Sequence, residues 1–353
     1  MRERAESLSD RLQFWNLSAL LPSVMGFIYY YAFTTNFPSG GMSEAGYQGK
    51  WYHGVFQFRV LGREALLGWY HVLQRVLPES TTFKKQGVWS CLDSQFSPLF
   101  YFSICTFNTV FLIVTMLCFN RALGMRPGTR PAPAQLFGST AALLLIAASL
   151  YKVTPYDLPS YACLAAGIWL LGDAARLSAG RLAGVLVLIG VGTAVRESMA
   201  LLLSLRLAQG ICRFGVKGLL GKEARPFAVQ LAAMGGVFGV VYVALRVVMG
   251  RARVIDAITV GAFARPATVV GLAFAASAWM LATGALSAER ARLARWFVIC
   301  SAPYLATLLV AADLFEVRLY IPVVLVALGG SLLSGSESAG QRPEAAAGEA
   351  AGG

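Results

Sequence analysis

Apolar segments long enough to cross a lipid bilayer recur along the whole chain, and this feature constrains its fold most strongly. A helix that crosses the hydrocarbon core needs about 20 mostly apolar residues. Only 14% of the 353 residues are charged, whereas soluble domains carry roughly 25%. This excludes a soluble globular protein and a disordered one, and the short alternating strands of a transmembrane barrel are not seen. We expect ten apolar segments at 17–35, 98–120, 134–151, 160–175, 182–195, 198–212, 227–249, 268–287, 296–312 and 317–334.

The fold class predicted from this pattern is an all-α, polytopic membrane protein with about ten transmembrane helices. Residues 1–334 form a single integral membrane domain, and the Gly/Ala/Ser/Glu-rich residues 335–353 form a disordered cytoplasmic tail. The first long loop, 36–97, is predicted to be external. Within it, 55–77 has charges that disfavour a span but apolar residues that share one side, which predicts an amphipathic interfacial helix. The alternative is an eleventh span, which would invert the topology downstream.

The distribution of Lys and Arg predicts how the chain is oriented in the membrane, because cytoplasmic loops carry an excess of both. One set of alternate short loops holds Arg121, Arg126, Arg130, Arg176, Arg181, Arg213, Lys217, Lys222, Arg225, Arg290, Arg292 and Arg295. The other set holds fewer, namely Lys152, Arg196, Arg251, Arg253 and Arg265. We therefore predict that both termini are cytoplasmic. The net charge of +12 then reflects topology, so nucleic acid is not an expected partner. The Ala-, Gly- and Arg-rich composition points to a bacterial cytoplasmic (inner) membrane.

Ionisable residues at membrane depth are costly and mark candidate functional sites. The predicted topology places several of them, from distant parts of the chain, on the outer face. The candidate catalytic carboxylates are Glu44 and Asp157. The candidate substrate- or phosphate-binding residues are Arg59, Arg63, Arg196, Glu197, Glu316 and Arg318, because a guanidinium can bind phosphate through two hydrogen bonds.

Six of these eight residues also have a structural interpretation that the sequence leaves open. Arg196 and Glu197 can neutralise each other at a helix turn, and Glu316 and Arg318 can form an interfacial pair. Asp157 can cap a helix, and Glu44 can be a solvated loop residue. The two histidines lack HExxH spacing, and no Cys/His spacing for a metal is present.

This order of elements resembles the GT-C superfamily of integral membrane glycosyltransferases, which use lipid-phosphate sugars. Members carry an acid in the first external loop followed by an interfacial helix, as Glu44 and 55–77 do. The segment Arg196-Glu-Ser-Met-Ala is similar to an Arg-centred element of the eukaryotic mannosyltransferases. Their late Lys-Glu-x-Arg-Phe element, followed by Pro, is similar to the segment from Glu316 to Pro322. The paired acids of that first loop are missing here, so a divalent metal has no support and no cofactor is predicted.

The resemblance implies transfer of a sugar, with inversion, from a polyprenyl-phosphate donor to an acceptor on the outer face of the membrane. Glu44, with Asp157 as second choice, would act as the base, and Arg196 and Arg318 would stabilise the phosphate leaving group. The expected partners are the polyprenyl-phosphate sugar donor and membrane lipids. The alternatives are a transporter or flippase of a lipid-linked or anionic substrate, and a non-enzymatic membrane assembly subunit.

Overall fold

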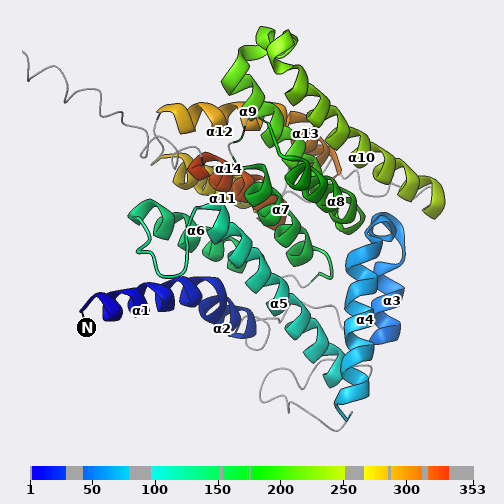
Figure 1. Cartoon of the computed structure of the whole chain (residues 1–353). Helices are drawn as coiled ribbons and strands as arrows, with labels where there is room; N and C mark the ends of the chain where they lie inside the picture. The colour runs from blue at the N-terminus through cyan, green and yellow to red at the C-terminus, as the bar shows by residue number, and fades with distance from the viewer. Residues whose placement is uncertain are drawn as a thin grey trace, which may run out of the picture.

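The computed structural model describes residues 2–28, 43–78, 97–150, 154–172, 174, 176–250, 266–284, 288–311 and 317–333. Within these residues the chain is helical and has no strands (Figure 1), which confirms the all-α class. The α-helices are α1 (Arg2–Trp15), α2 (Leu21–Ile28), α3 (Glu44–Trp51), α4 (Val60–Val76), α5 (Pro98–Ala122), α6 (Pro133–Ser149), α7 (Asp157–Leu171), α8 (Ala179–Val195), α9 (Ala200–Gly218), α10 (Arg225–Met249), α11 (Pro266–Gly284), α12 (Ala288–Cys300), α13 (Ala302–Ala311) and α14 (Ile321–Leu333). A π-helix, η1 (Asn16–Leu20), and four 3₁₀ turns, η4 (Gly54–Phe58), η6 (Glu197–Met199), η7 (Lys222–Ala224) and η10 (Val317–Leu319), complete the described elements.

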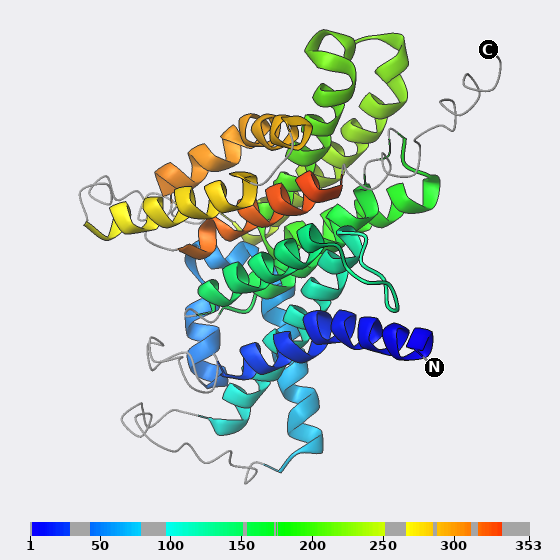
Figure 2. The same ribbon diagram turned by 90° about the vertical axis from the view of Figure 1, so that its left-hand side faces the viewer.

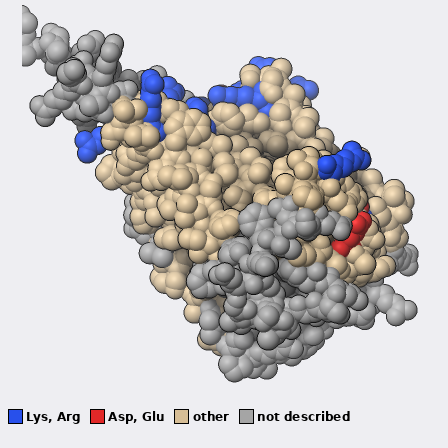
Figure 3. Space-filling model, turned by 90° about the horizontal axis from the view of Figure 1, so that it is seen from below, with Lys and Arg blue, Asp and Glu red and all other residues tan. Residues whose placement is uncertain are grey.

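The described helices have the apolar character of a membrane protein. Three of them, over Pro98–Ala122, Glu197–Gly218 and Lys222–Met249, are long and apolar enough to cross a bilayer. Each of the ten predicted segments coincides with at least part of a helix, but several of these helices are shorter than a full span. The face drawn in Figure 3 is mostly uncharged in its described part, with blue Lys and Arg side chains gathered near its edges.

Two predicted segments differ in detail from the helices that they match. The segment 296–312 is interrupted at Ser301, where α12 ends and α13 begins. The interfacial helix predicted over 55–77 is a 3₁₀ turn followed by α4, because Arg59 (φ −94°, ψ 54°) breaks the helix between them. The helices α1 and α3 were not predicted. The tail 335–353 lies outside the described residues.

Helix α7 lies at the core of the bundle, surrounded by other helices. This helix packs on α5 and α8, α8 packs on α10, and α9 packs on α12. Because α7 is apolar on all sides, it can be surrounded by other helices. Leu164, Ile168, Leu202 and Val326, from α7, α9 and α14, are all fully buried in one cluster. The α9–α10 hairpin projects beyond these helices in both ribbon views (Figure 1, Figure 2).

A buried polar cluster supports the turn that follows α7. The guanidinium of Arg206 donates to the Ala174 carbonyl (2.7 Å), and the Gln209 amide donates to the Gly172 carbonyl (2.7 Å). The amide of Gln230 bonds both the N–H and the carbonyl of Leu177. Buried backbone groups at a helix end need such partners. The cluster therefore has a structural role. This role was not predicted from the sequence, because Arg206 lies inside the predicted apolar segment 198–212.

This turn follows the C-terminus of α7, and Asp157 lies at the N-terminus of the same helix. We call the end of the bundle that contains Asp157 the Asp157 end. The 15 residues of α7 extend over about 22 Å. A bilayer has a hydrocarbon core about 30 Å thick. The helix is therefore about 8 Å shorter than the hydrocarbon core of a bilayer of that thickness.

Candidate functional site

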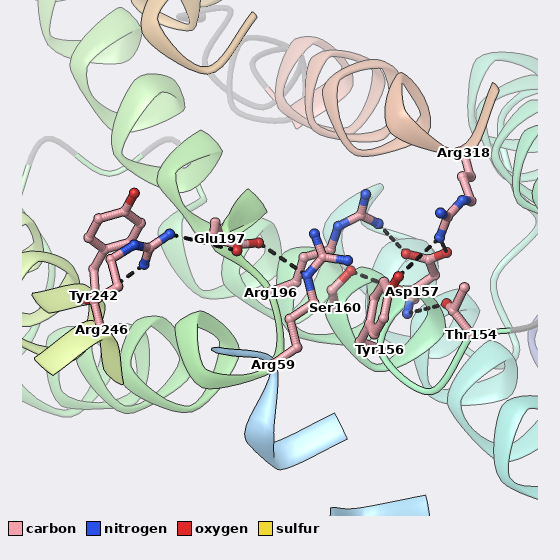
Figure 4. A network of polar contacts seen from close by, with 10 residues as sticks. All are labelled: Arg59, Thr154, Tyr156, Asp157, Ser160, Arg196, Glu197, Tyr242, Arg246 and Arg318. Atoms are coloured by element: carbon pink, nitrogen blue, oxygen red, sulfur yellow. Dashed lines mark hydrogen bonds and ion pairs between the residues drawn. The ribbon is translucent and has the colours of Figure 1, made fainter. Parts of the chain in front are cut away.

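Asp157 lies between two arginines at the first turn of α7. Its Oδ1 accepts a hydrogen bond from Nη1 of Arg196, and its Oδ2 accepts one from Nη1 of Arg318 at 2.9 Å (Figure 4). All three side chains are more than nine-tenths buried. The backbone of this turn is held by Thr154, whose Oγ1 accepts a hydrogen bond from the Asp157 N–H (3.1 Å). The Asp157 carboxylate is thus left to hold the two guanidiniums.

The two arginines reach Asp157 from breaks in other helices. Arg196 is extended (φ −165°, ψ 144°) between α8 and η6, so the chain turns at this residue. Arg318 lies on η10, immediately before α14. Its carbonyl accepts a hydrogen bond from the Tyr161 hydroxyl (3.2 Å), which ties η10 to α7. The three side chains form a clamp that joins segments distant in sequence, and we call it the Asp157 clamp.

A second ion cluster lies next to this clamp, because Glu197 follows Arg196 in the chain. The Glu197 carboxylate contacts Nε of Arg59 (3.4 Å) and Nη2 of Arg246 (3.9 Å). These side chains are more open than the clamp, since 28% of Glu197 and 33% of Arg246 are exposed. We call Arg59, Glu197 and Arg246 the outer triad. Figure 4 shows the triad and the clamp side by side.

Aromatic rings hold the two cations of the outer triad in place. The Arg59 guanidinium carbon lies 4.2 Å from the ring centre of Tyr156. The Arg246 guanidinium carbon lies 3.4 Å from the ring centre of Tyr242 and 4.8 Å from that of Phe58. A guanidinium stacked on a ring keeps its N–H groups free to point sideways. This arrangement presents two cations at fixed positions.

Charge in the outer triad is unbalanced among the described residues. Two guanidiniums share one carboxylate, both at distances that are long for a charge-assisted hydrogen bond. Nε of Arg59 is buried and, although it faces Glu197, lacks hydrogen-bonding geometry to a described partner. The triad is therefore suited chemically to a further anion, and a phosphate fits guanidinium geometry.

A close contact of α4 places Arg59 at the site. Gly62, in the first turn of α4, lies against the backbone that leads into α7. A Cβ added there would be 2.7 Å from the Pro155 carbonyl oxygen and 3.1 Å from the Tyr156 Cα. Only a residue without a side chain allows this approach. The contact positions η4 and Arg59 over Tyr156.

We expect Gly62→Ala to displace α4 from the turn before α7, because the obstructing atoms belong to backbone. Overpacking of this kind costs about 1–3 kcal/mol. Thermal unfolding in detergent would measure the loss of stability. Gly68→Ala, on the same helix with open space around its Cβ position, is the matched control and should unfold like the wild type. Equal stability of the two variants would contradict the proposed contact.

Arg63 connects α3 to α4 and does not join the triad or the clamp by any contact found among the described residues. Its Nε donates to Glu64 (3.1 Å), its Nη1 donates to the Trp51 carbonyl (3.4 Å), and its guanidinium stacks on Tyr52. Burial and a hydrogen bond with Glu64 raise the pKa of Tyr52 to about 12, so its hydroxyl stays protonated at neutral pH. These contacts give Arg63 a structural role.

Glu44 begins α3, where Ser43 supplies the helix cap. Its carboxylate contacts His71 on α4 and Gln48 on its own helix, both at 3.3 Å, and is 37% exposed. The contacts of Glu44 are thus separate from those of Asp157 and Glu197. Its role as a base stays a prediction. Glu316 lies outside the described residues.

Arg246 and the rings of Tyr156 and Tyr242 are the parts of the site that sequence reasoning missed. Arg246 lies within the apolar segment 227–249, and an ionisable residue in such a segment is itself a signal of function. Among the described residues, no group of three or more His, Cys, Asp or Glu side chains is placed to hold a metal ion.

Comparisons with protein-family models, curated proteins and solved structures give no match to this chain. The similarity to the GT-C superfamily therefore stays a prediction. The clamp and the outer triad are the features of this chain that bear on its function.

Proposed function

We propose that this protein is a membrane glycosyltransferase that binds the phosphate of a polyprenyl-phosphate sugar at Arg59 and Arg246. The observation that carries the proposal is the outer triad, in which two partly exposed guanidiniums share a single carboxylate. A lipid phosphate can approach them and form the paired hydrogen bonds that guanidiniums favour. The charge on Glu197 holds the two arginines together until the phosphate arrives.

The Asp157 clamp serves this site by fixing its backbone. Both oxygens of Asp157 are engaged, so the clamp fixes the backbone at Arg196. Glu197 is the next residue, and its position is fixed in turn. When the sugar leaves, negative charge develops on the phosphate, and preorganised cations stabilise that charge most where water is scarce.

The proposal includes ten membrane crossings, cytoplasmic termini and an Asp157 end that faces outward from the cytoplasmic membrane. The excess of Lys and Arg in alternate loops supports this orientation. The short α7 supports a site that is recessed from the membrane surface.

One observation favours a second function, movement of a phosphate-bearing lipid between leaflets. Among the described residues, the two carboxylates of the site, Asp157 and Glu197, each face two guanidiniums. Neither is placed to accept a proton from an acceptor hydroxyl. A flippase needs the phosphate-binding cations but no base.

Proteoliposomes that contain a labelled polyprenyl-phosphate sugar and a candidate acceptor would separate the two functions. Transfer of label from lipid to acceptor supports the glycosyltransferase. Movement of intact labelled lipid to the opposite leaflet supports the flippase. If the label is not transferred, the lipid does not move and the protein does not bind polyprenyl phosphate, both functions are refuted.

Glu44→Gln tests whether the base predicted from sequence takes part in transfer. Because Glu44 contacts His71 and Gln48 rather than the site arginines, we expect initial rates within about threefold of the wild type. Removal of a general base lowers rates by roughly 10²–10⁴-fold. A decrease of that size in the proteoliposome assay would establish Glu44 as the base.

A further inference from the structure

One flank of α10 leads directly to Arg246. Gly235, Gly239, Tyr242 and Arg246 follow one another at spacings of four, three and four residues, so they share one side of the helix. No described atom lies within 4 Å of the position that a Cβ would take at Gly235 or Gly239. The flank is therefore an open strip that ends at a guanidinium.

The strip borders the most exposed apolar surface of α10. Val240, Val243 and Val247, on the adjoining side, are 57–75% exposed. Few residues of this long apolar helix are buried. In a membrane such a surface faces lipid chains. The strip thus connects the lipid phase with the outer triad.

The length of the strip and its charged end suit a lipid that carries a phosphate. The 11 residue steps from Gly235 to Arg246 extend over about 16 Å along the helix. A hydrocarbon chain that lies along the two glycines would place its phosphate at Arg246 and Arg59. These two guanidiniums share a single carboxylate, so they have positive charge left for a phosphate. This charge complementarity favours an anionic lipid over a second apolar helix as the occupant.

We propose that the Gly235–Gly239 strip binds the first part of the hydrocarbon chain of a long-chain polyprenyl phosphate, and that Arg246 contacts its phosphate. The strip would give the site selectivity for long chains over short ones. This inference rests on the proposed function for the phosphate contact, but not on whether sugar transfer or lipid movement follows.

Gly239→Leu tests the inference, because a leucine side chain would fill the strip beside the chain. Gly236→Leu is the matched control, since this neighbouring glycine has equally open surroundings but faces another side of α10. Binding of a long-chain polyprenyl phosphate and of a short-chain isoprenyl phosphate would be measured for both variants. We expect Gly239→Leu to weaken long-chain binding about tenfold, from the loss of a few methylene contacts. Short-chain binding, and all binding by Gly236→Leu, should stay within about twofold.

A second measurement locates the chain without relying on affinity. A long-chain polyprenyl phosphate with a photoreactive group in its first isoprene units should cross-link to residues 235–246 of the wild-type protein. Short-chain binding by Gly239→Leu shows that this variant is folded.

The possible results separate failure of the inference from failure of the proposed function. If binding depends on Arg59 and Arg246 but cross-links fall elsewhere and Gly239→Leu is neutral, the strip is not the chain site and the phosphate site stands. If Gly239→Leu changes the oligomeric state and leaves lipid binding unchanged, the strip is a helix interface instead. If neither lipid binds in an arginine-dependent way, the proposed function fails and the inference fails with it.

Discussion

Asp157→Asn should destabilise the protein by about 3–5 kcal/mol, the cost of breaking a buried ion pair by removing one partner. The substitution preserves shape but leaves Arg196 and Arg318 buried without their shared carboxylate. Thermal unfolding in detergent would measure the change. Because the clamp joins α7, η6 and η10, the loss should affect the cooperative unfolding of the whole bundle.

Two controls distinguish the clamp from a general effect of removing an acid. Glu44→Gln removes a carboxylate that is 37% exposed, and its stability should change by less than about 0.5 kcal/mol. Combining Asp157→Asn with Arg318→Gln removes opposite charges together, so the double variant should be less destabilised than the sum of the single ones. Additive losses would show that the two residues do not interact, and a stable Asp157→Asn variant would contradict the clamp.

Arg59→Gln and Arg246→Gln should each lower the rate of sugar transfer or lipid movement by about 10²–10³-fold, the effect of removing one preorganised donor from a developing charge. Both side chains are partly exposed, and each contacts a carboxylate at 3.4 Å or more. Their removal should therefore cost little stability. The proteoliposome assay and thermal unfolding, applied to the same preparations, would separate the two effects.

Arg181→Gln provides the matched control for the outer triad. This arginine is exposed in the first turn of α8, at the opposite end of that helix from Arg196. Its substitution changes net charge equally, so transfer and binding should stay at the wild-type level. Equal losses in Arg181→Gln and Arg246→Gln would mean that overall charge, rather than the triad, attracts the anionic substrate.

The sequence by itself determined the helical class and the approximate place of most helices, because long apolar runs have few folding alternatives. The predicted order of helices also placed Arg59, Asp157, Arg196, Glu197 and Arg318 at one face, and the structure brings these five residues together. Their proximity has a physical basis. The ends of alternate helices must meet at one side of a bundle, so turn residues can be sorted by counting helices.

Only the tertiary structure decided which carboxylate forms an ion pair with which arginine. A helix rotates by about 100° per residue, so the direction of a side chain depends on packing that no local pattern specifies. Glu44 and Arg63 were grouped with the site from their place in the chain, but α3 and α4 turn them toward His71 and Tyr52. Arg246 was overlooked inside an apolar helix, yet the packing of α10 on α8 brings it to Glu197. Contacts between segments distant in sequence form only when helices pack, and at this site those contacts decide which groups can meet a substrate.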